Sequence, residues 1–310
     1  MVFLWSYVLK QKKMVPIYLR TGKKNCEEIM EKTLKKYFAL FALPGIVCFL
    51  LAFIIPMLMG IYLSFCEFRN LKEVTWVGIQ NYIDAFTVDK NYSSALWFTV
   101  KFTVVTVISI NIFSFGLALL LTKGLKGTNI YRTIFFMPNL IGGIVLGWIW
   151  QVIINGVLLK YDATIVSDPK YGFWGLVVLM NWQNVGYMMV IYIAAIQNIS
   201  TDMLEAASID GAGYWRTLFQ IIIPAVMPSV TICLFMTLTN GFKLFDQNLA
   251  LTAGAPGKQT EMLALNIYNT FYGRVGYEGV GQAKAVMFTI MVAVIALVQL
   301  RLTRSKEIEN

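Results

Sequence analysis

Long stretches without a single Asp, Glu, Lys or Arg dominate the pattern of polar and apolar positions along this chain. About 20 apolar residues in a helix cross the ~30 Å hydrocarbon core of a bilayer, and five of the six runs meet that length. We therefore predict an all-α integral membrane protein with six transmembrane helices. The runs lie between these pairs of charged residues: Lys36 and Glu67, Lys101 and Lys123, Arg132 and Lys160, Lys170 and Asp202, Arg216 and Lys243, and Lys284 and Arg301.

The sixth run is shorter than the others and covers only residues 285–300. A helix this short can still cross a bilayer if it uses its polar flanks. We expect Lys284 to snorkel, with its aliphatic stem along the apolar surface and its ammonium group in water.

Composition supports the membrane assignment. The 310 residues are 57% hydrophobic and only 14% charged, with a mean hydropathy of +0.64, outside the range of soluble domains. The net charge of +9 is interpreted as membrane topology, because no basic stripe interleaved with aromatic residues indicates nucleic-acid binding.

Histidine is absent from the chain, and its four cysteines are widely spaced. This pattern predicts neither a disulfide framework nor a metal site. The lack of histidine also removes the commonest general base and makes hydrolytic catalysis a poor hypothesis. The cysteines are Cys26, Cys48, Cys66 and Cys233.

Basic residues between the runs indicate the orientation. With the N-terminus inside, 16 of the 26 Lys and Arg residues fall on the cytoplasmic side, so the positive-inside rule places both termini in the cytoplasm. The connection TKGLKGTNIYR, residues 122–132, has three basic residues and no acid. We therefore expect a multi-pass protein of the cell membrane.

The first residues, MVFLWSYVL, are too short to span a membrane and lack the small-residue cleavage site of a signal peptide. Met14 and Met30 are alternative starts. We expect a cytoplasmic or interfacial segment over residues 1–36, a six-span domain over 37–305 and a tail over 306–310.

The connection between the fourth and fifth runs holds the sequence EAASIDGAGYWRTLFQIIIP, residues 205–224. Asp202 and Glu205 have the spacing of a helix N-cap and its reciprocal carboxylate. Gly211 and Gly213 permit a turn, after which residues 214–223 can form a second helix ending near Pro224. This predicts a helical hairpin at about residues 200–223, although the same features also suit a simple capped connector.

This stretch resembles the EAA motif of permease subunits in binding-protein-dependent ABC importers. YRTIFFMPNLIGG from Tyr131, FKLFDQNLALTAGAP from Phe242 and KQTEMLALNIYNTFY from Lys258 are also similar to maltose-type and multiple-sugar-type permeases. The resemblance extends from about Leu34 onward. LTAGAP departs from the family, which often has three successive glycines there.

The resemblance implies the type I importer permease fold and a non-catalytic transport subunit for carbohydrate, especially oligosaccharide. It also implies a second permease subunit, two ATPase subunits carrying ATP and Mg, and an extracytoplasmic solute-binding protein. In that family the EAA hairpin docks on the ATPase. The implied coupling residues are Glu205, Ala206, Ala207, Asp210 and Gly211.

Two other functions stay open on the residues alone. One is a stand-alone secondary transporter, and the other is a lipid-modifying membrane enzyme using Lys243 and Asp246, which have the spacing of one helix face. Nucleotide binding at GAPGKQT, from Gly254, is disfavoured because Thr252 replaces the first glycine of the phosphate-loop pattern and Gln259 follows the lysine.

Neutral amides and aromatic residues are concentrated in the third to fifth runs. Polar groups at membrane depth face protein or a watery cavity. They suit a sugar, whose hydroxyl groups need donors and acceptors and whose C–H faces stack on rings; hydrogen bonding between helices is the ordinary alternative. The expected substrate-path residues are Asn181, Asn184, Tyr187, Asn240 and Lys243.

Overall fold

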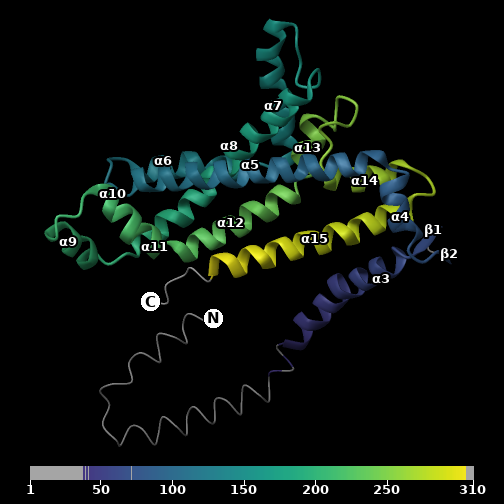
Figure 1. The fold of residues 1–310 in the computed structure, drawn as a ribbon, viewed down its shortest axis with the longest axis horizontal. Helices are drawn as coiled ribbons and strands as arrows, with labels where there is room; N and C mark the ends of the chain where they lie inside the picture. The colour runs from purple at the N-terminus through teal and green to yellow at the C-terminus, as the bar shows by residue number, and fades with distance from the viewer. Residues whose placement is uncertain (1–37, 39, 41, 71, 305–310) are drawn as a thin grey trace, which may run out of the picture. The chain divides into compact units, whose positions relative to one another are not determined.

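The structure is a computed structural model that describes residues 38, 40, 42–70 and 72–304 (Figure 1). The predicted segment at residues 1–36, the alternative starts Met14 and Met30, and the tail at 306–310 lie outside the described residues. The chain divides into two compact units, residues 1–60 and 61–310.

The first unit contributes most of one candidate span. An apolar helical stretch, Ala42–Leu63, includes the π-helical turn η1 (Leu50–Ile54) and continues as α3 (Ile55–Leu63). No residue of η1 or α3 is buried. An apolar helix with exposed sides on all faces is suited to a lipid environment.

The second unit contains the other candidate spans. They are α5 (Lys90–Leu121), α7 (Gly143–Leu158) with the 3-10 turn η3 (Leu159–Tyr161), α8 (Pro169–Gln197), α15 (Glu278–Arg304), and a bent pair of helical stretches. Five described helices are long and apolar enough to cross a membrane, or six if the bent pair counts as one span. The six-helix prediction is confirmed in that sense.

The bent span begins with α10 (Tyr214–Thr217), the π-helical turn η4 (Leu218–Ile222) and α11 (Ile223–Ala225). It continues as α12 (Met227–Phe242) after a bend of 69°. Val226 leaves helical geometry at the bend, and a proline, Pro228, follows at the start of α12. Proline has no N–H to donate and its ring clashes with the preceding turn, which explains the break.

Polar contacts join the central helices α5, α8 and α12. Asn111 of α5 donates to the Thr237 hydroxyl of α12 (3.0 Å) and accepts from the Tyr192 hydroxyl of α8 (2.7 Å). Ser114 donates to the carbonyl of Val185 (2.9 Å). Hydrogen bonds of this kind substitute for hydrophobic attraction between helices in a membrane.

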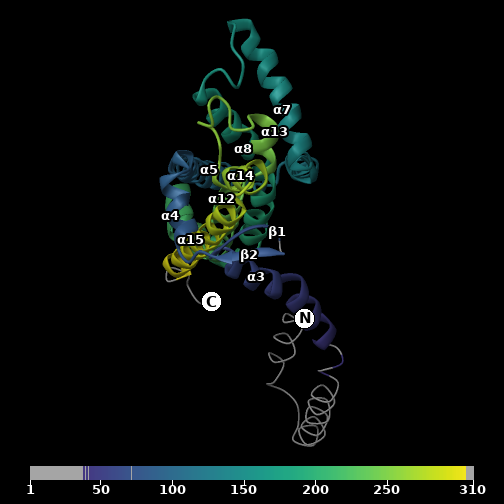
Figure 2. The same cartoon turned by 90° about the vertical axis from the view of Figure 1, so that its right-hand side faces the viewer.

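Smaller elements lie at the two ends of these helices (Figure 1), and one of these ends faces the viewer in Figure 2. One end carries the antiparallel strands β1 (Cys66–Asn70) and β2 (Glu73–Trp76), with Cys66 opposite Trp76, followed by α4 (Gln80–Thr87). The helix α14 (Leu263–Gly273) lies at the same end. The helix α9 (Thr201–Ile209) and α10 lie at the opposite end.

Three elements complete the second unit. They are α6 (Thr128–Phe136), the 3-10 turn η2 (Met137–Leu140) and α13 (Asp246–Leu251). The helix α6 packs on α8, and α13 packs on α7.

Two local predictions are wrong. Lys284 does not snorkel: it lies inside α15, which is 27 residues long, and its side chain is 0% exposed. Asp202 is not the N-cap of the hairpin helix, because α9 begins at Thr201 with Ser200 as its N-cap and has no side-chain cap hydrogen bond.

Candidate functional site

A polar cavity of about 440 Å³ lies where α8 faces the end of α12 and the start of α13. Its volume is within the range of small-molecule sites. Half of its lining residues carry an amide, and it also has one cation, one carboxylate and one aromatic ring. The lining residues are Asn139, Met180, Gln183, Asn184, Asn240, Lys243, Leu244, Phe245, Asp246 and Gln247.

Hydrogen bonds fix several of these amides. Gln247 of α13 donates to the side-chain oxygen of Gln183 on α8 (2.8 Å), and Gln183 donates to the carbonyl of Ile141 (3.3 Å). Asn184 donates to the carbonyl of Met180 one turn earlier (3.0 Å). The cavity wall is therefore an ordered amide surface that retains acceptors and donors for a ligand.

Two glycines on α7 bring α13 into place. A Cβ at Gly143 would lie 2.8 Å from the Cβ of Asp246, and one at Gly147 would lie 2.7 Å from the Cβ of Ala250. Only a residue without a side chain permits this approach. The close packing determines where Asp246 and Gln247 meet the cavity.

The expected path residues separate into two groups. Asn184, Asn240 and Lys243 line the cavity together. Asn181 instead donates to the carbonyl of Val177 (2.8 Å), and Tyr187 packs beside Phe136 with a centroid distance of 6.2 Å. Neither Asn181 nor Tyr187 is among the lining residues.

The structure adds Asn139, Gln183 and Gln247 to this amide set. Gln183 belongs to the polar cluster of the fourth run that the sequence already indicated. Gln247 was not a candidate because its position depends on how α13 folds back against α7.

Lys243 and Asp246 do not share one helix face, so that prediction is wrong. Lys243 is the C-cap of α12, whereas Asp246 is the first residue of α13. Helix α12 ends at Phe242, and the chain leaves helical geometry before α13 begins at Asp246. Among the described residues, no ion pair joins the two, and both line the cavity separately.

The predicted hairpin forms at the other end of the unit. Gly211 follows α9 with φ of +73°, its N–H donates to the carbonyl of Ser208, and the N–H of Ala212 donates to the carbonyl of Ala207. These two bonds are a Schellman motif, which closes a helix end with a left-handed glycine. The hairpin thus has the glycine turn that the sequence predicted at Gly211.

Exposure differs among the implied coupling residues. Glu205, Ala206, Asp210 and Gly211 are exposed, whereas Ala207 is buried. Ile209, next to them, is 86% exposed. An exposed isoleucine beside a carboxylate offers a protein partner both apolar area and a charge.

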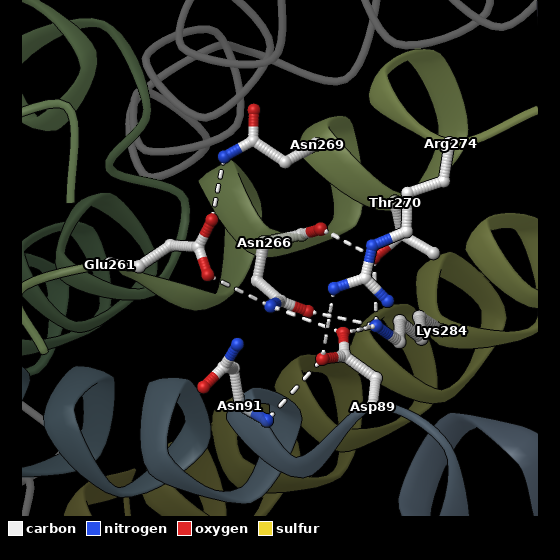
Figure 3. A network of polar contacts seen from close by, with 8 residues as sticks. All are labelled: Asp89, Asn91, Glu261, Asn266, Asn269, Thr270, Arg274 and Lys284. Atoms are coloured by element: carbon white, nitrogen blue, oxygen red, sulfur yellow. Dashed lines mark hydrogen bonds and ion pairs between the residues drawn. The ribbon is translucent and has the colours of Figure 1, made fainter. Parts of the chain in front are cut away.

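A buried network of polar side chains joins α5, α14 and α15 (Figure 3). The Lys284 ammonium donates to Asp89, which is the N-cap of α5, to Asn266 (3.0 Å) and to the Thr270 hydroxyl (2.8 Å). All three ammonium hydrogens therefore have an acceptor. Sequence inspection missed this network because its members are far apart in the chain.

A second carboxylate completes the network. Glu261 accepts from Asn266 (2.9 Å) and Asn269 (2.6 Å), and Arg274 lies 3.5 Å from Asp89. The cluster thus contains two carboxylates and two cations, and buried charges require such partners.

The position of Asp89 affects its titration. Burial by itself raises the pKa of the Asp89 carboxyl, but the hydrogen bond and charge of Lys284, together with Arg274 and the Asn91 backbone N–H, hold that pKa below its ordinary value. The carboxylate form is therefore the form that the folded network favours.

Comparison with protein families gives a match over residues 111–305, which is more than half of the chain. The matching family is described as "Binding-protein-dependent transport system inner membrane component". The chain belongs to this family. It is therefore a multi-pass membrane permease, a transport subunit and not an enzyme.

Relatives of this permease are similar over nearly their whole length. The chain is 41% identical over 281 residues to the "Probable starch degradation products transport system permease protein AmyD" of Thermoanaerobacterium thermosulfurigenes, covering 88% of this chain and 96% of that protein. It is 26% identical to the "Multiple sugar-binding transport system permease protein MsmF" of Streptococcus mutans, covering 90% and 99%.

A solved structure has the same fold. It is a chain of a "bacterial alginate ABC transporter in complex with alginate pentasaccharide-bound periplasmic protein", with a TM-score of 0.74 at 19% identity, covering 88% of this permease and 96% of that chain. The type I importer permease fold expected from the sequence is confirmed. These relatives give no support to a stand-alone secondary transporter or a lipid-modifying enzyme.

Proposed function

We propose that this permease forms half of the translocation path of an ATP-driven carbohydrate importer in a bacterial cell membrane. The observation that carries the proposal is the amide-lined cavity, where Asn184, Asn240 and Gln247 lie with the ring of Phe245. Amides offer both donors and acceptors to sugar hydroxyls, and a ring offers a face for C–H groups.

The similarity to AmyD supports an oligosaccharide as the solute, because that protein is described as transporting starch degradation products. MsmF and the alginate importer are likewise described by the saccharides that they handle. We take short α-linked glucans as the first solutes to test.

The proposed assembly has a second permease subunit, two ATPase subunits and an extracytoplasmic solute-binding protein. The alginate importer, described in complex with a loaded periplasmic protein, supports the last of these. ATP binds with Mg to the ATPase subunits, and its hydrolysis there supplies the energy of transport. This chain converts that energy into movement of its helices.

Coupling to the ATPase occurs through the hairpin of α9 and α10. Glu205, Ala206 and Ile209 are exposed on it, and the Schellman turn at Gly211 keeps the hairpin stiff enough to transmit force. This hairpin is cytoplasmic in the proposed topology, as are both termini, so the end with α4 and α14 faces outward.

The path is tested in proteoliposomes that hold the whole importer with its binding protein. Asn240→Ala should reduce uptake of radiolabelled maltotriose roughly tenfold, because a buried solute hydroxyl then loses its partner. Asn129→Ala, at an exposed position on α6, is the matched control. Unchanged uptake in Asn240→Ala for glucose, maltose and maltotriose would remove this cavity from the path.

The coupling proposal needs a separate measurement. Glu205→Arg should abolish co-elution of the ATPase subunits with the permease, whereas Glu73→Arg, an exposed position on β2 at the other end of the unit, should leave it intact. A Glu205→Arg permease that retained its ATPase and transported at the parental rate would refute the coupling role.

A further inference from the structure

A second cavity, of about 410 Å³, lies between α14 and α15 and shares Phe245 with the polar cavity. The two cavities are therefore neighbours that meet at one aromatic side chain. None of its lining residues is charged. They are Phe245, Ala264, Ile267, Tyr268, Phe271, Tyr272, Gly281, Gln282 and Ala285.

A continuous row of rings forms one wall of this cavity. The centroids of Phe245 and Tyr268 are 5.1 Å apart, those of Tyr268 and Tyr272 are 4.9 Å apart, and those of Tyr272 and Phe271 are 4.8 Å apart. Tyr268 is 43% exposed and Tyr272 is 72% exposed. The row thus leads from the polar cavity to an accessible surface.

The opposite face of α14 is held rigidly. Asn266 and Thr270, one turn apart, both accept from Lys284 in the buried network (Figure 3). The N–H of Leu263 at the start of α14 donates to the Thr99 hydroxyl of α5 (2.8 Å). Residues 268 and 272 lie about half a turn away from 266 and 270 on the helix. A fixed helix therefore presents the tyrosines.

We propose that this aromatic row is a second sugar subsite, which stacks one pyranose ring of an oligosaccharide while a neighbouring ring occupies the polar cavity. Tyr268 and Tyr272 are then residues that determine specificity for chain length. The inference rests on the proposed carbohydrate function. It goes beyond that function because it assigns the preference for two or more linked rings to one helix face.

The chemistry of the cavity favours a sugar over other occupants. Its wall is aromatic and uncharged, which matches the C–H faces of a neutral sugar. Two tyrosine hydroxyls and the Gln282 amide at this wall can bind hydroxyl groups. Because the amide-lined cavity adjoins this one at Phe245, the neighbouring sugar ring can bind to polar groups there. Rigid anchoring of α14 lowers the entropy lost on stacking.

The experiment compares glucose, maltose and maltotriose uptake by the assembled importer in proteoliposomes. Tyr268→Leu and Tyr272→Leu should lower the ratio of maltotriose to glucose uptake by roughly three- to tenfold, because a stacking partner is lost. Tyr268→Phe keeps the ring and should retain at least half of the parental ratio. Tyr161→Leu, an exposed tyrosine that lines neither cavity, is the matched control with the parental ratio.

Each other outcome overturns the subsite. If uptake of all three sugars falls equally, or if it does not fall at all, the aromatic row does not determine the preference for chain length. Loss of the second permease subunit on purification of Tyr268→Leu shows that this face is a subunit interface. Activity restored by changing the lipid composition shows a lipid site. A parental importer that moves none of these sugars removes short α-linked glucans as its solutes, and the subsite for their linked rings with them.

Discussion

Lys284 of α15 and Asp89 at the start of α5 form a buried ion pair between residues 195 positions apart in the chain. The pair ties the first long helix of the second unit to the last. Removing one partner from a buried pair leaves an uncompensated charge, which costs about 3–5 kcal/mol.

We expect Lys284→Met to lower the stability of the purified permease by about that amount, read as a lower midpoint of thermal unfolding in detergent. The double variant Lys284→Met with Asp89→Asn should recover part of the loss, because both charges are then gone. Lys101→Met removes an exposed lysine that lies over Trp97 and should change the midpoint little. A Lys284→Met permease as stable as the parent would show that the pair contributes nothing.

Acidification should weaken the same network. The folded state lowers the pKa of Asp89 below 3.8. The ionised Asp89 therefore stabilises the fold above pH 3.8, and this stabilisation is lost as the pH falls through the lower pKa of the folded state. Unfolding midpoints of the parent and Asp89→Asn should differ at pH 6, and the difference should shrink as the pH falls below 3.8. Asp202→Asn, at an exposed position, serves as the control. A difference between the two midpoints that stayed constant down to pH 3 would show that ionised Asp89 does not stabilise the fold.

Gly186 of α8 packs directly on the main chain of α6. A Cβ at this position would lie 1.8 Å from the carbonyl oxygen of Phe135, and a backbone atom cannot rotate away. We expect Gly186→Ala to cost about 1–3 kcal/mol or more and to reduce the monodisperse peak in size-exclusion chromatography. Gly116→Ala on α5, where a Cβ would meet nothing within 4 Å, should leave that peak unchanged. Equal peaks would mean that α6 can shift away from α8.

Asn248 holds the loop between α13 and α14. Its amide nitrogen donates to the carbonyl of Thr260 (2.8 Å), and its oxygen accepts from the N–H of Met262 (2.9 Å). Asn248→Ala leaves two buried backbone groups unpaired, at about 1–3 kcal/mol each. We expect trypsin to cleave this variant faster after the exposed Lys258.

The control for this loop is Asn129→Ala, which changes an exposed asparagine on α6. Its cleavage rate at Lys258 should match that of the parent. If Asn248→Ala were cleaved no faster, the loop would be held by other contacts.

Several features could be predicted from sequence because they depend on neighbouring residues. Runs without charge predicted the spans, since the apolar length of a helix is a property of its own residues. The glycine at position 211 predicted the hairpin turn, and its φ of +73° agrees. The EAA-like stretch indicated the family, which the match over residues 111–305 confirms.

Other predictions failed where a partner distant in the sequence decides the outcome. Lys284 has the position of a snorkelling residue, yet Asp89 and α14 enclose it. Lys243 and Asp246 have helical spacing, but α12 ends at Phe242 and Asp246 begins a separate helix, α13, that packs on α7.

By itself, therefore, the sequence determined the class of the protein, its spans and the hairpin turn at Gly211, all of which follow from local hydrophobicity and turn chemistry. Only the tertiary structure decided which amides meet in one cavity and which charges neutralise one another. Both depend on the approach of helices that are remote in the chain. At α7 that approach is permitted by the missing side chains of Gly143 and Gly147, and at α14 it is stabilised by the buried charge of Lys284.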